Sequence, residues 1–361
     1  MRSLVDRVES FGASVVAVIG LSKNCGKTTV LNHLIGAYHE LGLGLGVTSI
    51  GRDGEEMDAV TRLPKPKICV PAGTLAVTAD GSIGASHASL HVVARTGIPS
   101  ALGELLLVSA EGDGAVELSG PSTAEHAGSV AALLRSAGAT RVLIDGALDR
   151  RVTGAPLVCG AVVMSAGAVL GSTVESVAAH AAHHVALFQL PEVAGPCASA
   201  VRSAARERGE RAAVISPDGA GMKLPASALR TAESLAPIVA DDAVALWAGG
   251  AVTDEMIEEL LSGRARPEIV AADPTRVFVS RMWLSRWRAA GGRIAVLARA
   301  PVAAVTTNPF NPAGRGLDAY ELAEAVAGAV PGVPVYDVVA GITRCHGEDD
   351  LAEAVARPQP A

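Results

Sequence analysis

Aromatic residues and paired cysteines are both scarce in this chain of 361 residues. Phe, Trp and Tyr make up only 3% of it, so Ala, Val, Leu and Gly must supply the core. Such a composition suits packed helices and parallel strands better than an aromatic-rich β-sandwich. The cysteines are odd in number and contain no CxxC pair, which argues against a disulfide framework and against a structural zinc site. They are Cys25, Cys69, Cys159, Cys197 and Cys345.

Clustered basic residues and long apolar runs are also missing. The formal net charge is -7 and there is no basic tract, so a nucleic-acid partner is not expected. The first residues, MRSLVDRVESFGASVV, carry charges inside their apolar part, which is not typical of a signal peptide. The longest weakly polar run, at 155–170, is interrupted by Gly and Ser and is shorter than the roughly 20 residues of a spanning helix. We therefore expect a cytoplasmic protein that does not bind a membrane.

Apolar strand-like runs alternate with amphipathic segments along the chain. Residues 14–19 (SVVAVI) form a β-branched run typical of a buried parallel strand, and residues 27–41 have apolar positions at helical spacing. A second apolar run at 45–50 completes a βαβ unit, which is right-handed by default. The same alternation continues to residue 339. It predicts an α/β fold of the P-loop NTPase type, with a mainly parallel sheet flanked by helices.

The length of the chain suggests about two domains. A break in the pattern falls around residues 193–196, which favours a P-loop nucleotide-binding domain at 1–195. Residues 196–361 would then form a second, smaller α/β domain with a possible contact to a partner. One continuous doubly wound sheet is the alternative.

The strongest chemical motif is GLSKNCGKTT at residues 20–29, which follows the first strand and opens the first helix. In a loop of this kind, backbone N–H groups and the N-terminus of the helix bind phosphate, and Gly26 allows the close approach. Lys27 would reach the β and γ phosphates, and Thr28 would place its hydroxyl on Mg²⁺. The sequence predicts binding of a nucleoside triphosphate and Mg²⁺ by Gly20, Lys23, Asn24, Cys25, Gly26, Lys27, Thr28 and Thr29.

Two residues of this loop have two interpretations each. Lys23 contacts phosphate across the loop, or it is a solvated surface lysine. Cys25 is redox-sensitive because a helix N-terminus lowers a thiol pKa, or it is simply a small loop residue. The loop also has five residues between Gly20 and Gly26 where the common pattern has four. This spacing resembles dethiobiotin synthetase and the related cobyrinate-amidase branch of P-loop proteins.

Nucleotide hydrolysis also needs a carboxylate that holds Mg²⁺ directly or through water. Asp145 ends the apolar run RVLI, which is the setting expected of such an aspartate, and the alternative is a turn or helix-cap aspartate. Asp53 follows the second strand in IGRDGEE, where a switch-type loop would lie, and it has the same alternative. We expect Lys27, Asp145 and Asp53 to form the catalytic set, with Thr28, Asp145 and Asp53 around the metal.

Several motifs together resemble one family. Besides the loop they are TSIGRDGEEMDAVTRLPKPKI, LIDGALDRR, MSAGAVLGSTVESV, TTNPFNPAGRGLDAYELAEAV and VPVYDVV, which span most of the chain. This set is similar to the P-loop subunit of the lysine 5,6-aminomutase reactivase. The resemblance implies a partner subunit similar to the MutS ATPases. It also implies that ATP and Mg²⁺ drive the release of damaged cobalamin from an adenosylcobalamin-dependent aminomutase.

Other functions remain open at this point. A biosynthetic ligase or kinase similar to dethiobiotin synthetase fits the loop spacing and would act on a small carboxylate or amine. A nucleotide-binding regulatory subunit would bind tightly without turnover. No guanine-specific NKxD segment is visible, so ATP is preferred over GTP, which is not excluded.

Overall fold

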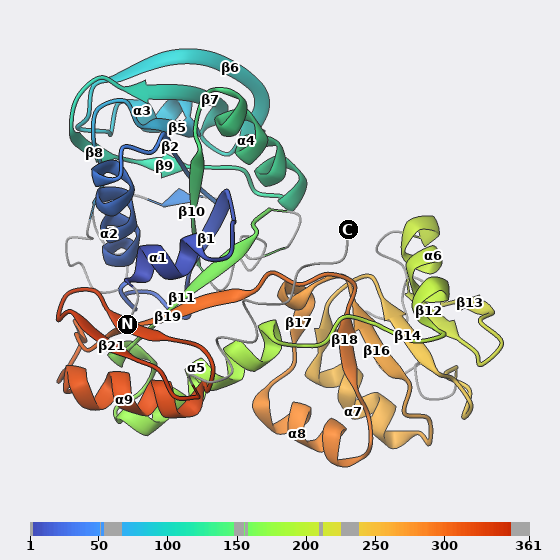
Figure 1. Cartoon of the computed structure of the whole chain (residues 1–361). Coiled ribbons are helices and arrows are strands. Elements are labelled where there is room, and N and C mark those ends of the chain that lie inside the picture. The colour runs from blue at the N-terminus through green and yellow to red at the C-terminus, as the bar shows by residue number, and fades with distance from the viewer. Residues whose placement is uncertain are drawn as a thin grey trace. The chain divides into compact units, whose positions relative to one another are not determined.

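The chain folds into two compact units (Figure 1). Unit 1 comprises the residues up to Val185 and those from Ala300 onward, and unit 2 comprises Ala186–Arg299. The computed structural model describes residues 3–50, 52–53, 67–147, 155, 158–208, 212–224 and 238–347.

A ten-stranded sheet forms the centre of unit 1. Its strands are β1 (Val15–Gly20), β2 (Leu45–Ser49), β5 (Leu75–Ala79), β6 (Leu90–Ser100), β7 (Gly103–Ala110), β10 (Arg141–Ala147), β11 (Ala161–Gly167), β19 (Val302–Asn308), β20 (Val335–Asp337) and β21 (Ile342–Arg344). They lie in the order β21-β20-β19-β11-β1-β10-β2-β5-β7-β6. From β20 through β5 the neighbours are parallel, whereas β21 at one edge and β7 and β6 at the other are antiparallel additions.

Helices and short strand pairs complete unit 1. The helices are α1 (Leu4–Glu9), α2 (Lys27–Glu40), α3 (Asp80–Ile83), α4 (Ala124–Ser136), α5 (Val174–Phe188) and α9 (Ala319–Ala329). The short pairs are β3 (Arg52–Asp53) with β9 (Leu118–Ser119), and β4 (Ile68–Val70) with β8 (Gly114–Val116). A 3-10 helix at Ala168–Leu170 leads from β11 to α5.

The helix that follows β1 is held by its apolar face. α2 buries Val30, Leu31, Leu34, Ile35 and Tyr38, which recur at three- and four-residue spacing. They pack with alternate residues of the parallel strands in one core cluster. Each fully buried aliphatic side chain contributes about 1.5–3 kcal/mol through removal from water. This packing fixes the start of α2 beside the end of β1.

Unit 2 has its own sheet and its own core. The sheet has five strands in the order β13-β12-β14-β16-β18, and only β14, β16 and β18 are parallel. Alternate strand residues enter two clusters, one with α7 and α8 and the other with α6, so both faces are covered. The elements are α6 (Ala198–Arg208), β12 (Ala212–Ile215), β13 (Gly221–Lys223), β14 (Ala245–Ala248), β15 (Val252–Thr253), α7 (Asp254–Ser262), β16 (Glu268–Ala271), a 3-10 helix (Pro274–Arg276), β17 (Val277–Phe278), α8 (Arg281–Ala289) and β18 (Ile294–Val296).

The α/β class and the large, mostly parallel sheet flanked by helices confirm the coarse prediction of the fold. The domain limits differ from the predicted division at residue 195. α5 runs without interruption to Phe188, past the start of unit 2, and β19 returns the chain from unit 2 to the sheet of unit 1. The segment predicted as one C-terminal domain, 196–361, therefore contributes to both units. Alternation of strands and helices does not reveal which sheet a strand joins.

No helix in the described part of the chain combines the length and the apolar character that crossing a membrane requires.

Helix α1 is tied to the sheet by one charged pair. The guanidinium of Arg141, at the start of β10, donates from Nε to Oε1 of Glu9 at 2.7 Å. This hydrogen bond is the main reason that the pKa of Glu9 lies below its ordinary value. The pair joins residues far apart in the sequence at the amino end of the parallel strands.

We expect Glu9→Gln to lower the free energy of unfolding by about 1 kcal/mol at neutral pH. Because folding lowers the pKa of Glu9 from 4.5, its contribution is present above pH 4.5 and is lost as the pH falls through the folded-state pKa. Denaturant unfolding of both proteins over this pH range measures the difference. Glu40→Gln, at the exposed end of α2, is the control. A stability difference that does not shrink in acid would contradict this assignment.

Candidate functional site

The loop between β1 and α2 has the backbone geometry of an anion site. α2 begins at Lys27, and its N-cap is Gly26 with a φ of 95° and no side-chain cap hydrogen bond. Asn24 is the one non-glycine residue with positive φ (60°) in the described ranges. The first N–H groups of a helix have no partner within the helix, and its dipole favours negative charge there. The start of α2 can therefore hold an anion such as phosphate.

The loop lies directly on the ends of two neighbouring strands. A Cβ on Gly26 would stand 2.8 Å from Cβ of Asn308, at the end of β19, and a Cβ on Gly167, at the end of β11, would stand 2.8 Å from Cα of Cys25. The backbone N–H of Leu21 donates to the carbonyl of Ser165 in β11 at 3.0 Å. These close approaches require glycine at both positions and leave the loop little freedom.

Asn308 fastens the loop from the side of β19. Its Nδ2 donates to the carbonyl of Asn24 at 3.1 Å, and its Oδ1 accepts from the backbone N–H of Phe310 at 3.2 Å. The amide thus supports the residue with unfavourable φ. Sequence reasoning gave Asn308 no role, although TTNPFNP was among the family-like motifs. Its neighbours Thr306 and Ser165, whose hydroxyls lie 2.9 Å apart and are buried, were missed in the same way.

A buried ion pair joins the start of α2 to β10. Nζ of Lys27 lies 2.9 Å from Oδ1 of Asp145, and these side chains are 14% and 1% exposed. The strand register places Asp145 beside Val18 of β1 and Ser49 of β2. The structure thereby brings together two residues that the sequence singled out more than a hundred positions apart. An isolated carboxylate this deeply buried would cost several kcal/mol, and the charge of Lys27 offsets part of that cost.

The other predicted residues lie around this pair. Thr28 and Thr29 are half-buried in the first turn of α2, and Lys23 is exposed on the loop. Exposure of Lys23 is compatible with both of its interpretations. The backbone of Asp53 lies in β3, opposite Leu118 of β9, just beyond the end of β2. The side chain of Asp53 lies outside the described residues, so its distance from Asp145 is not part of the site geometry.

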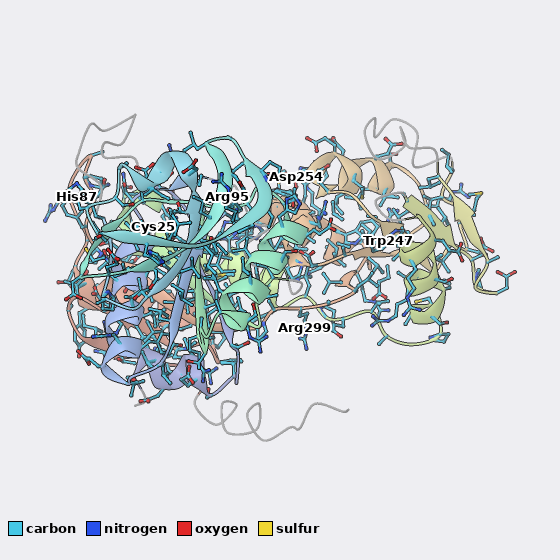
Figure 2. The ribbon with its side chains drawn as sticks, turned by 90° about the horizontal axis from the view of Figure 1, so that it is seen from above. Cys25, His87, Arg95, Trp247, Asp254 and Arg299 are labelled. Carbon is cyan, nitrogen blue, oxygen red and sulfur yellow. The ribbon has the colours of Figure 1, made fainter. Side chains whose placement is uncertain are left out.

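Cys25 is not a reactive thiol in this setting. Its side chain is 1% exposed, and burial raises its pKa, which outweighs the opposite effects of nearby N–H groups and of Lys27. In Figure 2 it lies inside unit 1, whereas the exposed His87 stands at the rim. A Cβ on Gly20 would stand 2.8 Å from its sulfur. The redox interpretation is therefore wrong in its premise of a lowered pKa, and Cys25 packs as a small residue.

The site lies at a topological switch point of the sheet, where the connections from two neighbouring strands run to opposite sides. The chain leaves β1 through α2 toward β2 on one side, and it leaves β11 through α5 toward β19 on the other. Open α/β sheets bind ligands outside the carboxyl ends of strands at such a switch point. Among the described residues no group of three or more His, Cys, Asp or Glu could hold a metal alone. The hard oxygens present, Asp145 and Thr28, suit Mg²⁺ shared with phosphate oxygens.

We expect Cys25 to react with iodoacetamide far more slowly than the exposed Cys69 at neutral pH. A buried thiol with a raised pKa offers little thiolate and little access. Mass spectrometry of peptides after brief treatment measures both rates, and the unfolded protein, in which both should react alike, is the control. Equal native rates would show that the loop opens readily.

Comparisons with known proteins add no relative to this picture. No protein-family model matches the chain, and no curated protein and no solved structure matches it either. What the site does is therefore inferred from its own chemistry and from the motifs of the sequence.

Proposed function

We propose that the chain is a P-loop NTPase that binds ATP with Mg²⁺ at the loop between β1 and α2 and hydrolyses it. The observation that carries the proposal is the ion pair between Lys27, in the first turn of α2, and Asp145, on the neighbouring parallel strand. A cation beside an uncapped helix N-terminus suits a polyphosphate, and the adjacent carboxylate suits its metal. ATP is preferred over GTP on the absence of an NKxD segment from the sequence.

Each residue has a defined role in this proposal. The N–H groups of the loop around Gly26 bind phosphate oxygens, and Lys27 exchanges Asp145 for the β and γ phosphates. The Thr28 hydroxyl and the Asp145 carboxylate would hold Mg²⁺, which neutralises phosphate charge. Asp53 would supply a second carboxylate to the metal or to its water. Lys23 and Asn24 would line the phosphate side of the loop, and Cys25 would shape it by packing.

The biological setting that we propose is a reactivating chaperone. Its support is the set of motifs similar to the P-loop subunit of the lysine 5,6-aminomutase reactivase. In that setting a MutS-like subunit is the partner, and an adenosylcobalamin-dependent aminomutase exchanges its damaged cobalamin. A ligand shifts a two-state equilibrium only by its difference in affinity for the two states. A nucleotide-controlled partner supplies this difference, and hydrolysis resets it.

The loop spacing favours a second candidate. Five residues between Gly20 and Gly26, as in dethiobiotin synthetase, suit a biosynthetic ligase or kinase. Such an enzyme would accelerate nucleotide turnover with a small carboxylate or amine and would need no protein partner. A regulatory subunit would bind nucleotide without turnover.

Replacement of Lys27 separates nucleotide binding from folding. We expect Lys27→Ala to weaken MgATP binding at least tenfold, because a hydrogen bond to a charged group contributes about 1.5–3 kcal/mol. It should also destabilise the fold by a few kcal/mol (about 3 at most), because it removes the cation beside the buried carboxylate of Asp145. The double variant Lys27→Ala/Asp145→Asn removes that charge, so it should recover stability but not binding. Calorimetric titration and thermal unfolding measure the two effects, with Lys67→Ala, an exposed lysine outside the loop, as the control.

Replacement of Asp145 tests the exchange of partners by Lys27. We expect Asp145→Asn to bind ATP without Mg²⁺ at least as well as the wild type, because the competing carboxylate is gone. The gain in affinity on adding Mg²⁺ and the rate of phosphate release should both fall sharply. Titration with and without Mg²⁺, followed by a phosphate-release assay, measures this. Unchanged Mg²⁺ dependence would remove Asp145 from the metal site.

The biological setting is tested by phosphate release with and without a cobalamin-inactivated aminomutase. Stimulated hydrolysis and recovery of aminomutase activity, both lost in Lys27→Ala/Asp145→Asn, are the expected results. Turnover that ignores the aminomutase but responds to a small carboxylate would replace the chaperone with the ligase.

A further inference from the structure

Helices α7 and α8 lie side by side on one face of the sheet of unit 2, whereas α6 lies on the other face (Figure 1). Each of the two follows one parallel strand and leads to the next, so both run in the same direction. The carboxylate of Asp254, at the start of α7, accepts from the backbone N–H of Ser280, just before α8, at 2.6 Å. The two helices therefore form one preorganised surface.

The two helices carry opposite charge. α7 (DEMIEELLS) has four acidic residues and no basic one, whereas α8 (RMWLSRWRA) has three arginines and no acidic residue. Glu255 and Glu258 of α7 are exposed, as are Arg281, Arg286 and Arg288 of α8. In the part of the chain that the structure describes, none of these side chains forms an ion pair. Their charges are thus available to another molecule.

The outermost positions of α8 are apolar or small, and the arginines flank them. Leu284 and Trp287 are buried against the sheet. On the opposite side of the helix, Met282, Ser285 and Ala289 follow one another at spacings of three and four residues. All three are exposed, and Met282 is 53% exposed. A solvated helix carries its charges at such positions, whereas an apolar seam with charged edges is the pattern by which helices pack on helices.

From these observations we infer that two copies of the chain associate through this surface, with α7 of each copy packed on α8 of the other. A two-fold axis in the interface, between the helices and parallel to them, produces this arrangement, because it exchanges the two positions and keeps the helix direction. Glu255 and Glu258 of one copy then face the arginines around Met282 of the other, twice in each dimer.

The charge pattern also selects this axis over the alternative. A two-fold axis that crosses the helices would stack α7 on α7 and α8 on α8. Acidic residues would then face acidic ones, and arginines would face arginines, which opposes association. No third protein is needed to satisfy both surfaces, since each copy supplies the complement of the other.

The contact is small, so the dimer is weak. A helix of nine residues is about 13 Å long, and neighbouring helix axes lie about 8–10 Å apart. Such a face is at the low end of specific interfaces, since stable complexes bury roughly 800 Å² on each partner. We expect a dissociation constant of about 10–100 µM at low salt.

Sedimentation velocity of the full chain, from micromolar to several hundred micromolar, measures the association. The wild type should show a reversible monomer–dimer equilibrium. Its dissociation constant should rise at least tenfold between about 50 mM and about 500 mM NaCl, because salt screens exposed charges. A wild type that stays monomeric throughout, or a dimer that is indifferent to salt, overturns the inference.

Two charge-reversed variants test which surfaces meet. Glu255→Arg/Glu258→Arg makes the outer face of α7 basic, and Arg281→Glu/Arg288→Glu makes that of α8 acidic. Each variant alone should self-associate at least tenfold more weakly, because like charges then face each other. An equimolar mixture should form a heterodimer about as tight as the wild-type dimer. Arg206→Glu, exposed on α6 at the other face of the sheet, is the control and should dimerise like the wild type.

Thermal unfolding checks that each variant is folded. Met282→Lys, a single change in the seam of α8, should also weaken the dimer at least tenfold, and it keeps the test decisive if a double variant does not fold. Self-association of a folded variant at the wild-type level overturns the inference. So does a mixture of the two folded, charge-reversed variants that remains monomeric, because α7 then does not meet α8.

Discussion

The ion pair between Lys27 and Asp145 is the interaction on which the carboxyl edge of the large sheet depends. It ties the first turn of α2 to β10 and neutralises a carboxylate that is almost wholly buried. An anion that draws Lys27 away from Asp145 weakens the neutralisation of a buried carboxylate, and a cation beside Asp145 would restore it. In the function that we propose, this exchange of partners would couple the anion to a metal. The coupling would give a physical reason for the joint uptake of a polyphosphate and Mg²⁺.

The shape of the loop depends on contacts with residues far away in the sequence. Gly167 lets β11 approach Cys25, and Asn308 fills the space beside Gly26 while its amide holds Asn24. A glycine-rich turn loses much backbone conformational entropy when it adopts one conformation. Close packing against the ends of β11 and β19, and the hydrogen bond from Asn308, offset this loss. The loop is thus preorganised by the sheet rather than by its own sequence.

The sequence was most informative where structure follows from continuous burial. The runs at 14–19 and 141–144 identified β1 and β10 because buried parallel strands are apolar on both faces. β6 was not predicted, since Leu90–Ser100 is exposed along most of its length and is held by pairing with β7. Residue types at the strand ends indicated Lys27 and Asp145, but their contact needed the register of β1 with β10. The contact of Asn308 with the loop depends on the pairing of β11 with β19. This pairing is long-range, so a local sequence pattern does not predict it.

The same long-range pairing explains why the division of the chain was misplaced. Unit 2 is inserted between β11 and β19, the two strands whose ends support the loop. Its entry runs through α5, which follows β11, and its exit leads into β19, which ends at Asn308. A displacement in unit 2 that is transmitted to the loop along the polypeptide would therefore pass through the end of β11 or through β19. At both strand ends the space beside the loop is too small for an added Cβ, so Gly167 and Asn308 are packed against Cys25 and Gly26. The chain connection between the two units therefore runs through the two strands whose ends carry the loop.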